Sequence, residues 1–327
     1  MAEVRGFAPG SLIGALLLAG CVAGGPVTDL SAVEVPERPG EVKPLPEAPG
    51  WAPSLTAVDG AQVPVAIWGP ERPGAVILAL HGYGGHGVES FTNAAKAWAD
   101  KGIVTVAPDQ RGFGRNPSRG IWPGADALIA DAEGYTAQLR AHFPCTPLIL
   151  LGHSMGGGIA LAAAPKADVD ALILSAPAIW GGHALEPLHR VAAWLAALAV
   201  PDTRFSGRGV VRIQASDNIE ALRALARDPL YLSPPSAREM FGLVRLTDRA
   251  AEAAAATRLP SLMLLGEKDQ IVPADPVRRV FGRLPGETDI IVYPDGWHLL
   301  FRDLQAKRVW ADVARFTLSQ PKPECPS

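Results

Sequence analysis

From residue 61 onward, short runs of β-branched and aliphatic residues alternate with longer stretches in which apolar residues recur at helical spacing. Continuous apolar runs of this kind are typical of strands that are buried on both faces of a sheet. The expected strands cover residues 63–68, 75–80, 103–107, 148–151, 171–175, 261–265 and 289–293. The expected crossover helices cover residues 91–101, 125–142, 159–166, 276–284 and 299–318. This alternation predicts an α/β fold, with a mostly parallel sheet and helices on both faces.

The regular alternation is interrupted once, between residues 176 and 258. Helices are expected here over residues 188–200 and 218–227, and a long insertion in an otherwise short-looped α/β protein is commonly functional. We interpret residues 176–258 as a cap over the site, inserted into a core formed by residues 55–175 and 259–320 and followed by a tail at residues 321–327. Most of its apolar side chains are expected to pack the cap onto the core, and some of them to line an acyl pocket. The candidates are Ile179, Trp180, Leu185, Trp194, Leu195, Leu198, Met240 and Phe241.

The first twenty residues follow a different pattern. Residues 7–18 are apolar apart from small residues and one proline, a stretch too short to span a bilayer but typical of a secretion signal. It ends in Leu18-Ala19-Gly20-Cys21, which resembles the bacterial lipobox, where the cysteine becomes the lipid-bearing first residue. The resemblance implies a signal peptide over residues 1–20 and lipidation of Cys21, and the alternative is a frayed apolar N-terminus.

Seven prolines between residues 26 and 53 exclude regular helices and strands from most of this stretch. We expect residues 21–54 to form an extended tether between a membrane and the globular part. Val22 after the cysteine resembles lipoproteins of the outer membrane, so the expected location is the periplasmic face of that membrane.

The charge of the chain limits the partners that it could bind. The chain has 30 basic and 33 acidic residues, and it has no run of Lys or Arg, so nothing in its charge favours nucleic-acid binding.

Besides Cys21 the cysteines are Cys145 and Cys325, which an exported compartment would allow to pair. Cys145 precedes a strand at the edge opposite the expected site, and the last helix should run back toward that edge. A disulfide is therefore within reach, and two free thiols are the alternative.

The pentapeptide Gly152-His153-Ser154-Met155-Gly156 lies directly between an expected strand and an expected helix. A Gly-x-Ser-x-Gly string alone is weak evidence, but this placement is what a nucleophile elbow requires. Small residues on both sides allow the sharp turn that exposes a serine hydroxyl. We therefore predict Ser154 as the nucleophile.

A serine hydroxyl needs a base to accept its proton and an acid to orient that base. In this type of fold the order along the chain is nucleophile, acid and histidine. Of the seven histidines only His298 follows the insertion, just after the last expected strand. Asp269 is the predicted acid, because Glu267 suits a solvated loop charge, Asp275 suits the start of the next helix and Asp295 lies too close to His298 on the same loop.

An acyl-transfer site also needs N–H groups directed at the developing oxyanion. Met155, the residue after the nucleophile, is expected to supply one backbone N–H, and Tyr83, in the loop after strand 75–80, the second. His81 and His86 precede the nucleophile and are expected to brace this loop.

Together these motifs resemble the monoacylglycerol lipase and lysophospholipase branch of the α/β-hydrolases, which is grouped with the serine aminopeptidases S33 (Hydrolase_4). The resemblance covers about residues 63–318 and rests on the following segments: His81-Gly82, residues 108–115, residues 152–157, Asp228-Pro229-Leu230, Asp269 and His298. Asp109 and Arg111 are expected to be structural and to fix a loop near the elbow by a charge-assisted hydrogen bond.

The resemblance implies a serine hydrolase without metal or organic cofactor that cleaves carboxylic esters through an acyl-enzyme. The expected substrate is a single-chain lipid ester, a monoacylglycerol or a lysophospholipid. A broad-specificity short-chain carboxylesterase, an acyltransferase and a non-catalytic binding lipoprotein are the alternatives. Monoacylglycerol lipases typically carry Glu-His followed by Arg-Tyr in the oxyanion loop, whereas this chain has Gly85-His86 followed by residues 87–90, which leaves the headgroup open.

Overall fold

The computed structural model describes residues 41–181, 187–204, 213–232 and 234–325. Its centre is a seven-stranded sheet in the order β3-β5-β4-β6-β7-β8-β9. The strands are β3 (Val65–Trp68), β4 (Ala75–Leu80), β5 (Ile103–Pro108), β6 (Leu148–His153), β7 (Ala171–Ser175), β8 (Ser261–Gly266) and β9 (Thr288–Tyr293). All neighbouring pairs are parallel except β3 with β5, which is antiparallel. The structure confirms the predicted α/β fold with a mostly parallel sheet.

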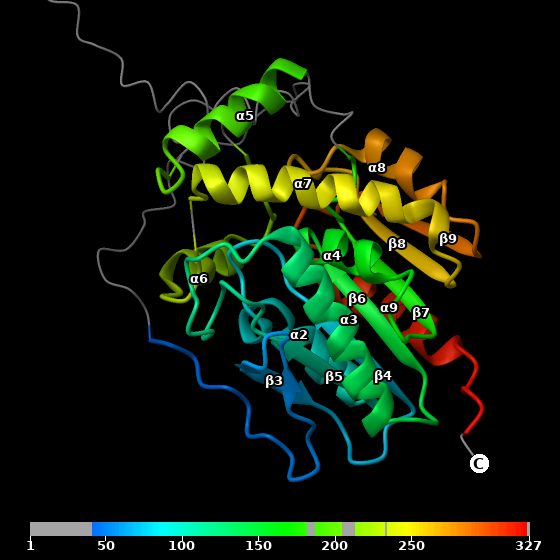
Figure 1. Ribbon diagram of the computed structural model, residues 1–327. Coiled ribbons are helices and arrows are strands. Elements are labelled where there is room, and N and C mark those ends of the chain that lie inside the picture. Colours follow the sequence, from blue (N-terminus) through cyan, green and yellow to red (C-terminus); the bar gives the residue numbers. More distant parts are fainter. Residues whose placement is uncertain (1–40, 182–186, 205–212, 233, 326–327) are drawn as a thin grey trace, which may run out of the picture.

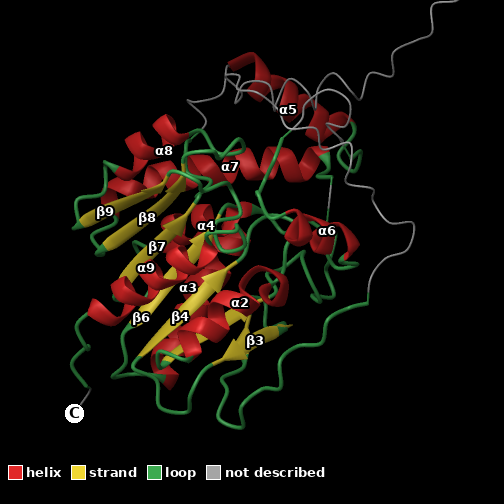
Figure 2. Cartoon of the chain, turned by 180° about the vertical axis from the view of Figure 1, so that it is seen from behind, coloured by secondary structure: helices red, strands yellow, loops and turns green. Residues whose placement is uncertain are grey.

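Helices cover both faces of this sheet (Figures 1 and 2). They are α2 (Gly87–Ala99), α3 (Ala125–His142), α4 (Met155–Ala163), α8 (Ala274–Phe281) and α9 (Ala306–Ser319). Successive side chains of a strand point to opposite faces. In β4, Leu78 therefore belongs to the apolar cluster of α3, α4 and α8, while Ile77 belongs to that of α2 and α9. The central strands are buried on both sides, as their continuous apolar runs indicated.

The first expected strand is divided into two. Pro64 has no N–H to donate, and the ladder changes partner there. Before it, β2 (Gln62–Val63) pairs with β1 (Leu55–Thr56) in a separate two-stranded sheet, and after it β3 pairs with β5.

Several helices begin elsewhere than expected. The side chain of His86 accepts a hydrogen bond from Glu89 N, so α2 begins at Gly87 and not at residue 91. The elbow leads straight into α4, which begins at Met155 and not at residue 159. In contrast, α9 begins later than expected, at Ala306 and not at residue 299. The N–H groups of Leu299 and Leu304 bond to residues of the insertion and so are not part of a helix.

The insertion after β7 contains α5 (Pro187–Ala199), α6 (Ile219–Arg227) and α7 (Ala237–Ala253). The long helix α7 was not expected. It begins with a reciprocal capping box between Ser236 and Glu239 and is followed by the short 3-10 turn η3 (Ala254–Ala256). It packs across α4 and α3 and carries α5 on its outer side (Figure 1).

Residues 1–40, which include the expected signal peptide, Cys21 and most of the tether, lie outside the described residues. Where the described chain begins, residues 41–49 form neither helix nor strand. Their carbonyl at Lys43 accepts a hydrogen bond from the guanidinium of Arg115.

In the described ranges, no helix is both long enough and apolar enough to cross a membrane.

Candidate active site

Ser154 occupies a sharp turn between the end of β6 and the start of α4. Its backbone has φ 54° and ψ −117°, a left-handed conformation that costs energy for a residue with a Cβ. The close approach of the chain on both sides requires glycine. A Cβ on Gly152 would lie 2.2 Å from Gly156 O, and one on Gly156 would lie 2.1 Å from Leu80 O. This strained geometry is that of a nucleophile elbow.

His298 follows β9 and reaches the elbow from the C-terminal edge of the sheet. Its Nε2 lies 3.0 Å from Ser154 Oγ, and its Nδ1 lies 2.9 Å from Asp269 Oδ2. A carboxylate can only accept, so Nδ1–H donates to Asp269 and Nε2 is left to accept from the serine hydroxyl. The three predicted residues thus form one hydrogen-bonded chain with the base in the useful tautomer.

Asp269 is held from both sides in the loop after β8. Its Oδ1 accepts from the backbone N–H groups of Ile271 and Val272, at 2.7 and 3.0 Å. Burial raises the pKa of Asp269, but the charge of His298 together with these hydrogen bonds outweighs it, so the pKa lies below the usual range. The carboxylate therefore stays ionised beside the imidazole.

The other carboxylates of these loops do not reach His298. Glu267 is exposed, and Asp295 pairs with Lys268 at 2.7 Å on the surface. Asp275 lies in the first turn of α8, where a negative charge favours the helix N-terminus. The structure brings Asp269 to the base and leaves these three apart.

The loop after β4 lies against the elbow. A Cβ on Gly82 would lie 3.2 Å from the Cβ of Ser154, so Tyr83, the next residue, is placed beside the nucleophile. On the other side, Met155 is the first residue of α4, where N–H groups have no partner within the helix. These are the two positions at which oxyanion donors were predicted.

The same loop is tied to the insertion by three contacts that the sequence did not reveal. Tyr83 Oη donates to Glu239 on α7 at 2.8 Å, and Leu232 N donates to Gly84 O at 2.9 Å. His86 Nε2 lies 3.0 Å from Asp228 Oδ2. The capping-box pattern around Glu239 was the available signal, but its contact with Tyr83, 156 positions away, was not readable.

His81 and His86 brace the loop, as expected. Nε2 of His81 accepts from Gln110 N at 3.0 Å. Burial, only partly offset by a hydrogen bond to Gly82 O and the charge of Asp109, lowers the pKa of His81 to about 4. The neutral ring is therefore a fixed support for the loop.

Asp109 and Arg111 do fix loops, but through different partners. Asp109 accepts from Gly87 N at 2.9 Å and from the guanidinium of Arg115 at 3.0 Å. Arg111 instead forms a bidentate ion pair with Asp131 on α3. Both are charge-assisted hydrogen bonds within the scaffold.

A second histidine, His153, lies behind the base. Its ring centroid is 5.1 Å from that of His298. Burial, followed by repulsion from His298, lowers the pKa of His153 to about 3. It was not singled out because the second position of the pentapeptide carries no chemistry of its own.

The expected acyl-pocket residues do not share one environment. Ile179 is fully buried in the core, Leu185 lies outside the described residues, and Trp194, Leu195 and Leu198 on α5 are exposed. Two cavities of about 270 and 400 Å³ lie beside α2 and the start of α9, and neither includes Ser154 or His298 among its walls. They are not places where a carbonyl could meet the nucleophile.

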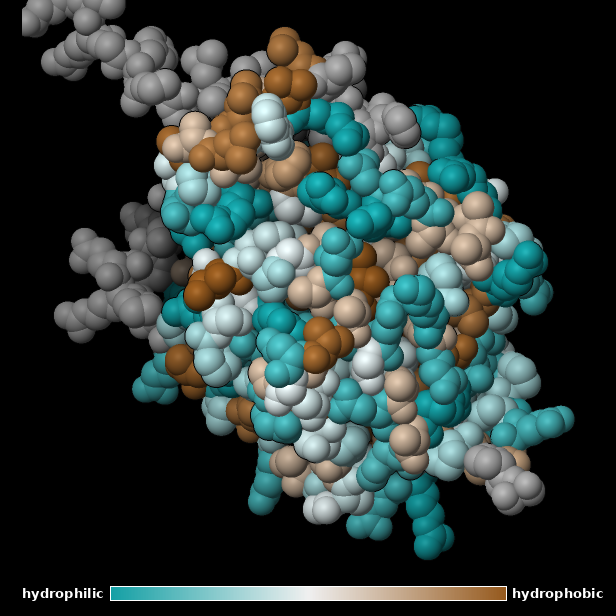
Figure 3. Space-filling model, in the orientation of Figure 1, coloured by the Kyte–Doolittle hydropathy of each residue, from teal (hydrophilic) through white to brown (hydrophobic). Residues whose placement is uncertain are grey.

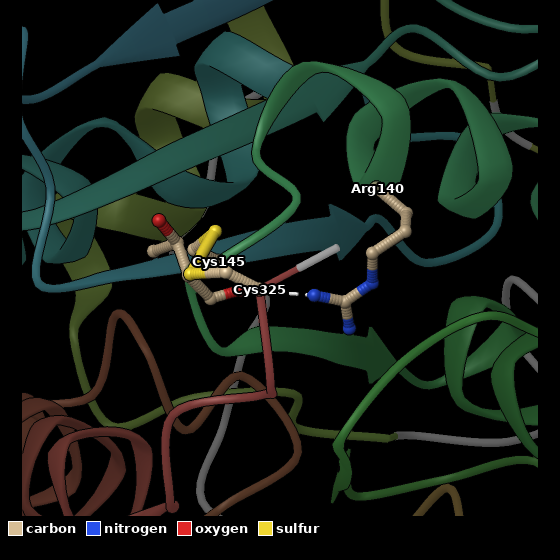
Figure 4. Close-up of a disulfide and its surroundings, with 4 residues drawn as sticks. Arg140, Cys145 and Cys325 are labelled. Atoms are coloured by element: carbon tan, nitrogen blue, oxygen red, sulfur yellow. Dashed lines mark hydrogen bonds between the residues drawn. A yellow bond between two sulfur atoms is a disulfide. The ribbon is translucent and has the colours of Figure 1, made fainter. Parts of the chain in front are cut away.

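A disulfide joins Cys145, before β6, to Cys325, after α9 (Figure 4). Arg140 lies beside it and donates to Thr146 O at 3.1 Å. The bond closes the chain across the sheet edge opposite Ser154, as the helix direction suggested. Cys21 lies outside the described residues.

Within the described ranges, no group of three or more His, Cys, Asp or Glu side chains could hold a metal ion.

A central parallel sheet with a serine elbow and a histidine–aspartate pair at its C-terminal edge defines an α/β-hydrolase, and this one is a hydrolase of carboxylic esters. The chain belongs to the serine aminopeptidase S33 family (Hydrolase_4), whose sequence model matches residues 71–305.

Relatives agree with this assignment. The chain is 28% identical over 278 residues to a monoacylglycerol lipase of Mycolicibacterium smegmatis, covering 81% of this chain and 96% of that protein. It is 24% identical over 265 residues to the monoglyceride lipase of Rattus norvegicus, covering 77% and 84%.

Solved structures share the fold. A soluble variant of monoglyceride lipase from Saccharomyces cerevisiae, in complex with a substrate analogue, aligns with a TM-score of 0.67 and 20% identity, covering 85% of this chain and 98% of that one. The monoacylglycerol lipase of Paleococcus ferrophilus aligns with a TM-score of 0.66 and 21% identity, covering 79% and 99%.

Proposed function

We propose that Ser154, His298 and Asp269 are the catalytic triad of this esterase and that its substrates are single-chain lipid esters. The observation that carries the proposal is the distance of 3.0 Å between Ser154 Oγ and His298 Nε2, with Asp269 behind the same ring. A neutral imidazole at this distance can accept the serine proton during attack.

In the proposed mechanism Ser154 Oγ attacks the ester carbonyl carbon while His298 Nε2 takes its proton. The N–H groups of Tyr83 and Met155 stabilise the oxyanion, and His298 then gives the proton to the leaving alcohol as the C–O bond breaks. Water attacks the acyl-enzyme with His298 again as base, which releases the acid and restores Ser154. Asp269 remains ionised and stabilises the imidazolium.

The substrate class rests on the relatives. Two of them, from Mycolicibacterium smegmatis and Rattus norvegicus, are named for the hydrolysis of monoacylglycerol. Monoacylglycerol and lysophospholipid share one acyl ester and differ in headgroup. Because the oxyanion loop of this chain lacks the usual Glu-His and Arg-Tyr pairs, we place both headgroups within the proposal.

A panel of esters tests this substrate class. Monoacylglycerols, lysophosphatidylcholine and p-nitrophenyl esters of increasing chain length are offered to the wild type, to Ser154→Ala and to the control Ser261→Ala. Ser261 is a buried serine at the start of β8, so it lies at the N-terminal ends of the parallel strands, opposite the end that carries Ser154. We expect hydrolysis of long single-chain esters by the wild type and the control only.

Other outcomes identify the alternatives. A flat profile across chain lengths without action on the two lipids would indicate a broad-specificity carboxylesterase. Transfer of the acyl group to an added alcohol in preference to water would indicate an acyltransferase. Absence of any hydrolysis or labelling would indicate a binding module.

We also propose that the chain is exported, lipidated at Cys21 and held by residues 21–54 at the periplasmic face of the outer membrane. The apolar stretch before Cys21 and the prolines after it support this location. So does an apolar surface over α5, visible as the brown area at the top of Figure 3. Its exposed side chains are Leu188, Val191, Trp194, Leu195 and Leu198. Such a face suits contact with lipid more than contact with water.

Fractionation of cells that express the full chain tests the anchor. The wild type is expected in the membrane fraction with an acylated Cys21 at its N-terminus, and Cys21→Ser in the soluble fraction. For the surface, Leu195→Asp is expected to weaken binding of the purified protein to vesicles, while Ile121→Asp, at an exposed loop residue, is not. An unmodified N-terminus, or equal vesicle binding by both variants, would contradict the respective proposal.

A further inference from the structure

Inside the insertion, between α5 and α6, residues 214–218 come back against the loops at the edge of the sheet, and we call them the return segment. It runs along the loop that follows β9 and is bonded to that loop repeatedly. Leu299 N donates to Ala215 O at 2.9 Å, Leu304 N to Asp217 Oδ1 at 2.9 Å, and Asn218 Nδ2 to Arg302 O at 2.8 Å. The loop that carries His298 is thus fastened to the insertion along its length.

The return segment also reaches the loop that carries Asp269. Gln214 N donates to the side-chain oxygen of Gln270 at 3.0 Å. Gln270 is the next residue after the proposed acid. One short segment therefore contacts both loops on which the histidine–aspartate pair is placed.

Asp303 lies at the centre of this arrangement and is almost fully buried, with 3% of its surface exposed. Its Oδ2 accepts from Trp297 N at 2.7 Å, and its Oδ1 accepts from Ser216 Oγ at 2.6 Å. Trp297 immediately precedes His298, so the first bond holds the peptide that leads into the base. The second bond ties the same carboxylate to the return segment.

An ionised group at this position is costly. Burial raises the pKa of Asp303 to about 6, although the bonds to Ser216 and Trp297 and the charge of His298 lower it, and Asp217 on the return segment raises it further. The neighbouring Arg302 interacts with Asp303 and pairs with Glu89 on α2. Two acceptor oxygens are needed here, and an amide would supply only one.

We propose that Asp303 is a positioning residue that holds His298 in its catalytic position. Through Ser216, it also makes the position of His298 depend on how the return segment of the insertion packs against the loop after β9. When the return segment is in place, Ser216 and Trp297 share the carboxylate and the imidazole stays within reach of Ser154. The proposal rests on the proposed triad.

The experiment compares Asp303→Asn, Asp303→Glu and Ser216→Ala with the control Asp131→Asn. Asp131 is an equally buried carboxylate that accepts from one backbone N–H, that of Val58, and from Arg111, but it lies on α3. The substrate is p-nitrophenyl butyrate, whose short chain makes little use of an acyl pocket. The readouts are kcat, KM, the rate of labelling by a fluorophosphonate, and Tm.

For Asp303→Asn we expect kcat and the labelling rate to fall together by about 10-fold to 100-fold, because small displacements of a catalytic group have effects of that order. KM should stay within about twofold, since the pocket is unchanged. Ser216→Ala should lower kcat by about fivefold, the equivalent of one hydrogen bond. Asp303→Glu should retain more kcat than Asn, and Asp131→Asn should retain kcat even where its Tm falls.

Wild-type kcat in Asp303→Asn, or equal losses in Asp303→Asn and Asp131→Asn, would overturn the proposal. If Asp303→Asn does not fold, wild-type kcat in both Ser216→Ala and Asp303→Glu overturns it, and a loss of kcat at constant KM in Ser216→Ala supports it. Ser154→Ala separates this inference from the proposed function. If that variant is active, the triad itself is wrong, and if it is inactive while Asp303→Asn is normal, only the positioning role is wrong.

Discussion

His298 Nδ1 and Asp269 Oδ2 lie 2.9 Å apart although 29 positions separate the two residues. They meet because β8 and β9 are parallel neighbours with Gly266 opposite Tyr293, so that the loops after both strands leave from the same edge of the sheet. Side chains at the carboxyl ends of adjacent parallel strands converge in this way in open α/β sheets. The pair is thus a consequence of the register.

Replacement of Asp269 by asparagine is expected to reduce kcat strongly. The amide can donate to Nδ1, which would favour the tautomer with the proton on Nε2 and remove the base from Ser154. We expect a loss on the order of 10³-fold or more with little change in Tm. Steady-state kinetics on p-nitrophenyl butyrate measures it. Asp295→Asn, in the exposed pair with Lys268, is the control and should keep the wild-type rate. Near wild-type turnover in Asp269→Asn would remove Asp269 from the triad.

Gly82→Ala tests the approach of the oxyanion loop to the elbow. The added methyl group would lie 3.2 Å from Ser154 Cβ and 3.3 Å from His153 Cδ2, so the loop with the Tyr83 N–H and the elbow must separate by a few tenths of an ångström. Loss of one oxyanion donor lowers kcat by about 10²-fold to 10³-fold, and we expect a loss approaching that range. Gly134→Ala, in the middle of α3 with no atom nearer than 3.9 Å, should leave kcat unchanged and raise stability slightly. Equal activity of the two variants would argue against Tyr83 as a donor.

The disulfide is expected to stabilise the fold without affecting catalysis. Cys145 and Cys325 are 180 positions apart, and a crosslink over such a distance restricts the unfolded chain. We expect the double variant Cys145→Ser, Cys325→Ser to lose about 3 kcal/mol of unfolding free energy in urea titrations, with unchanged kcat. A reductant should produce the same loss in the wild type and none in the double variant. Identical titrations with and without reductant would show that the bond does not form.

His153 is expected to make the fold sensitive to acid. An unfolded histidine binds a proton below about pH 6.5. Burial and then His298 lower the pKa of folded His153 to about 3, so unfolding takes up a proton between these values and stability falls as the pH falls. Compared with His153→Asn, the wild type should lose about 1 kcal/mol more of unfolding free energy for each pH unit between 6 and 5. Their difference at pH 7.5, where both side chains are neutral, gives the packing contribution of the ring. Parallel curves down to pH 5 would mean that His153 is protonated in the fold.

The order of the elements and the positions of Ser154, Asp269 and His298 could be predicted because their signals are local. A buried strand run, a glycine-flanked serine and a lone histidine after the last strand are each readable within a few residues, and the parallel register brings them together. Element ends could not be predicted equally well. The start of α9 depends on which N–H groups bond to the return segment, a contact between residues more than 80 positions apart.

The insertion was the least predictable part. Its apolar residues were expected to pack the cap onto the core or to line an acyl pocket, yet Trp194 and Leu198 are exposed, because an apolar residue is not obliged to be buried. Asp303 carried no motif, and its importance depends on Trp297 and Ser216 meeting one carboxylate. Such convergence is set by tertiary packing, which leaves no periodicity or spacing in the sequence.

The most direct test of the account is the position at which a fluorophosphonate labels the protein, determined by peptide mass spectrometry and followed together with ester hydrolysis. We predict a single adduct on Ser154, loss of hydrolysis in proportion to labelling, and neither labelling nor hydrolysis in Ser154→Ala. An adduct on a different residue, or hydrolysis by Ser154→Ala at the wild-type rate, would contradict the account.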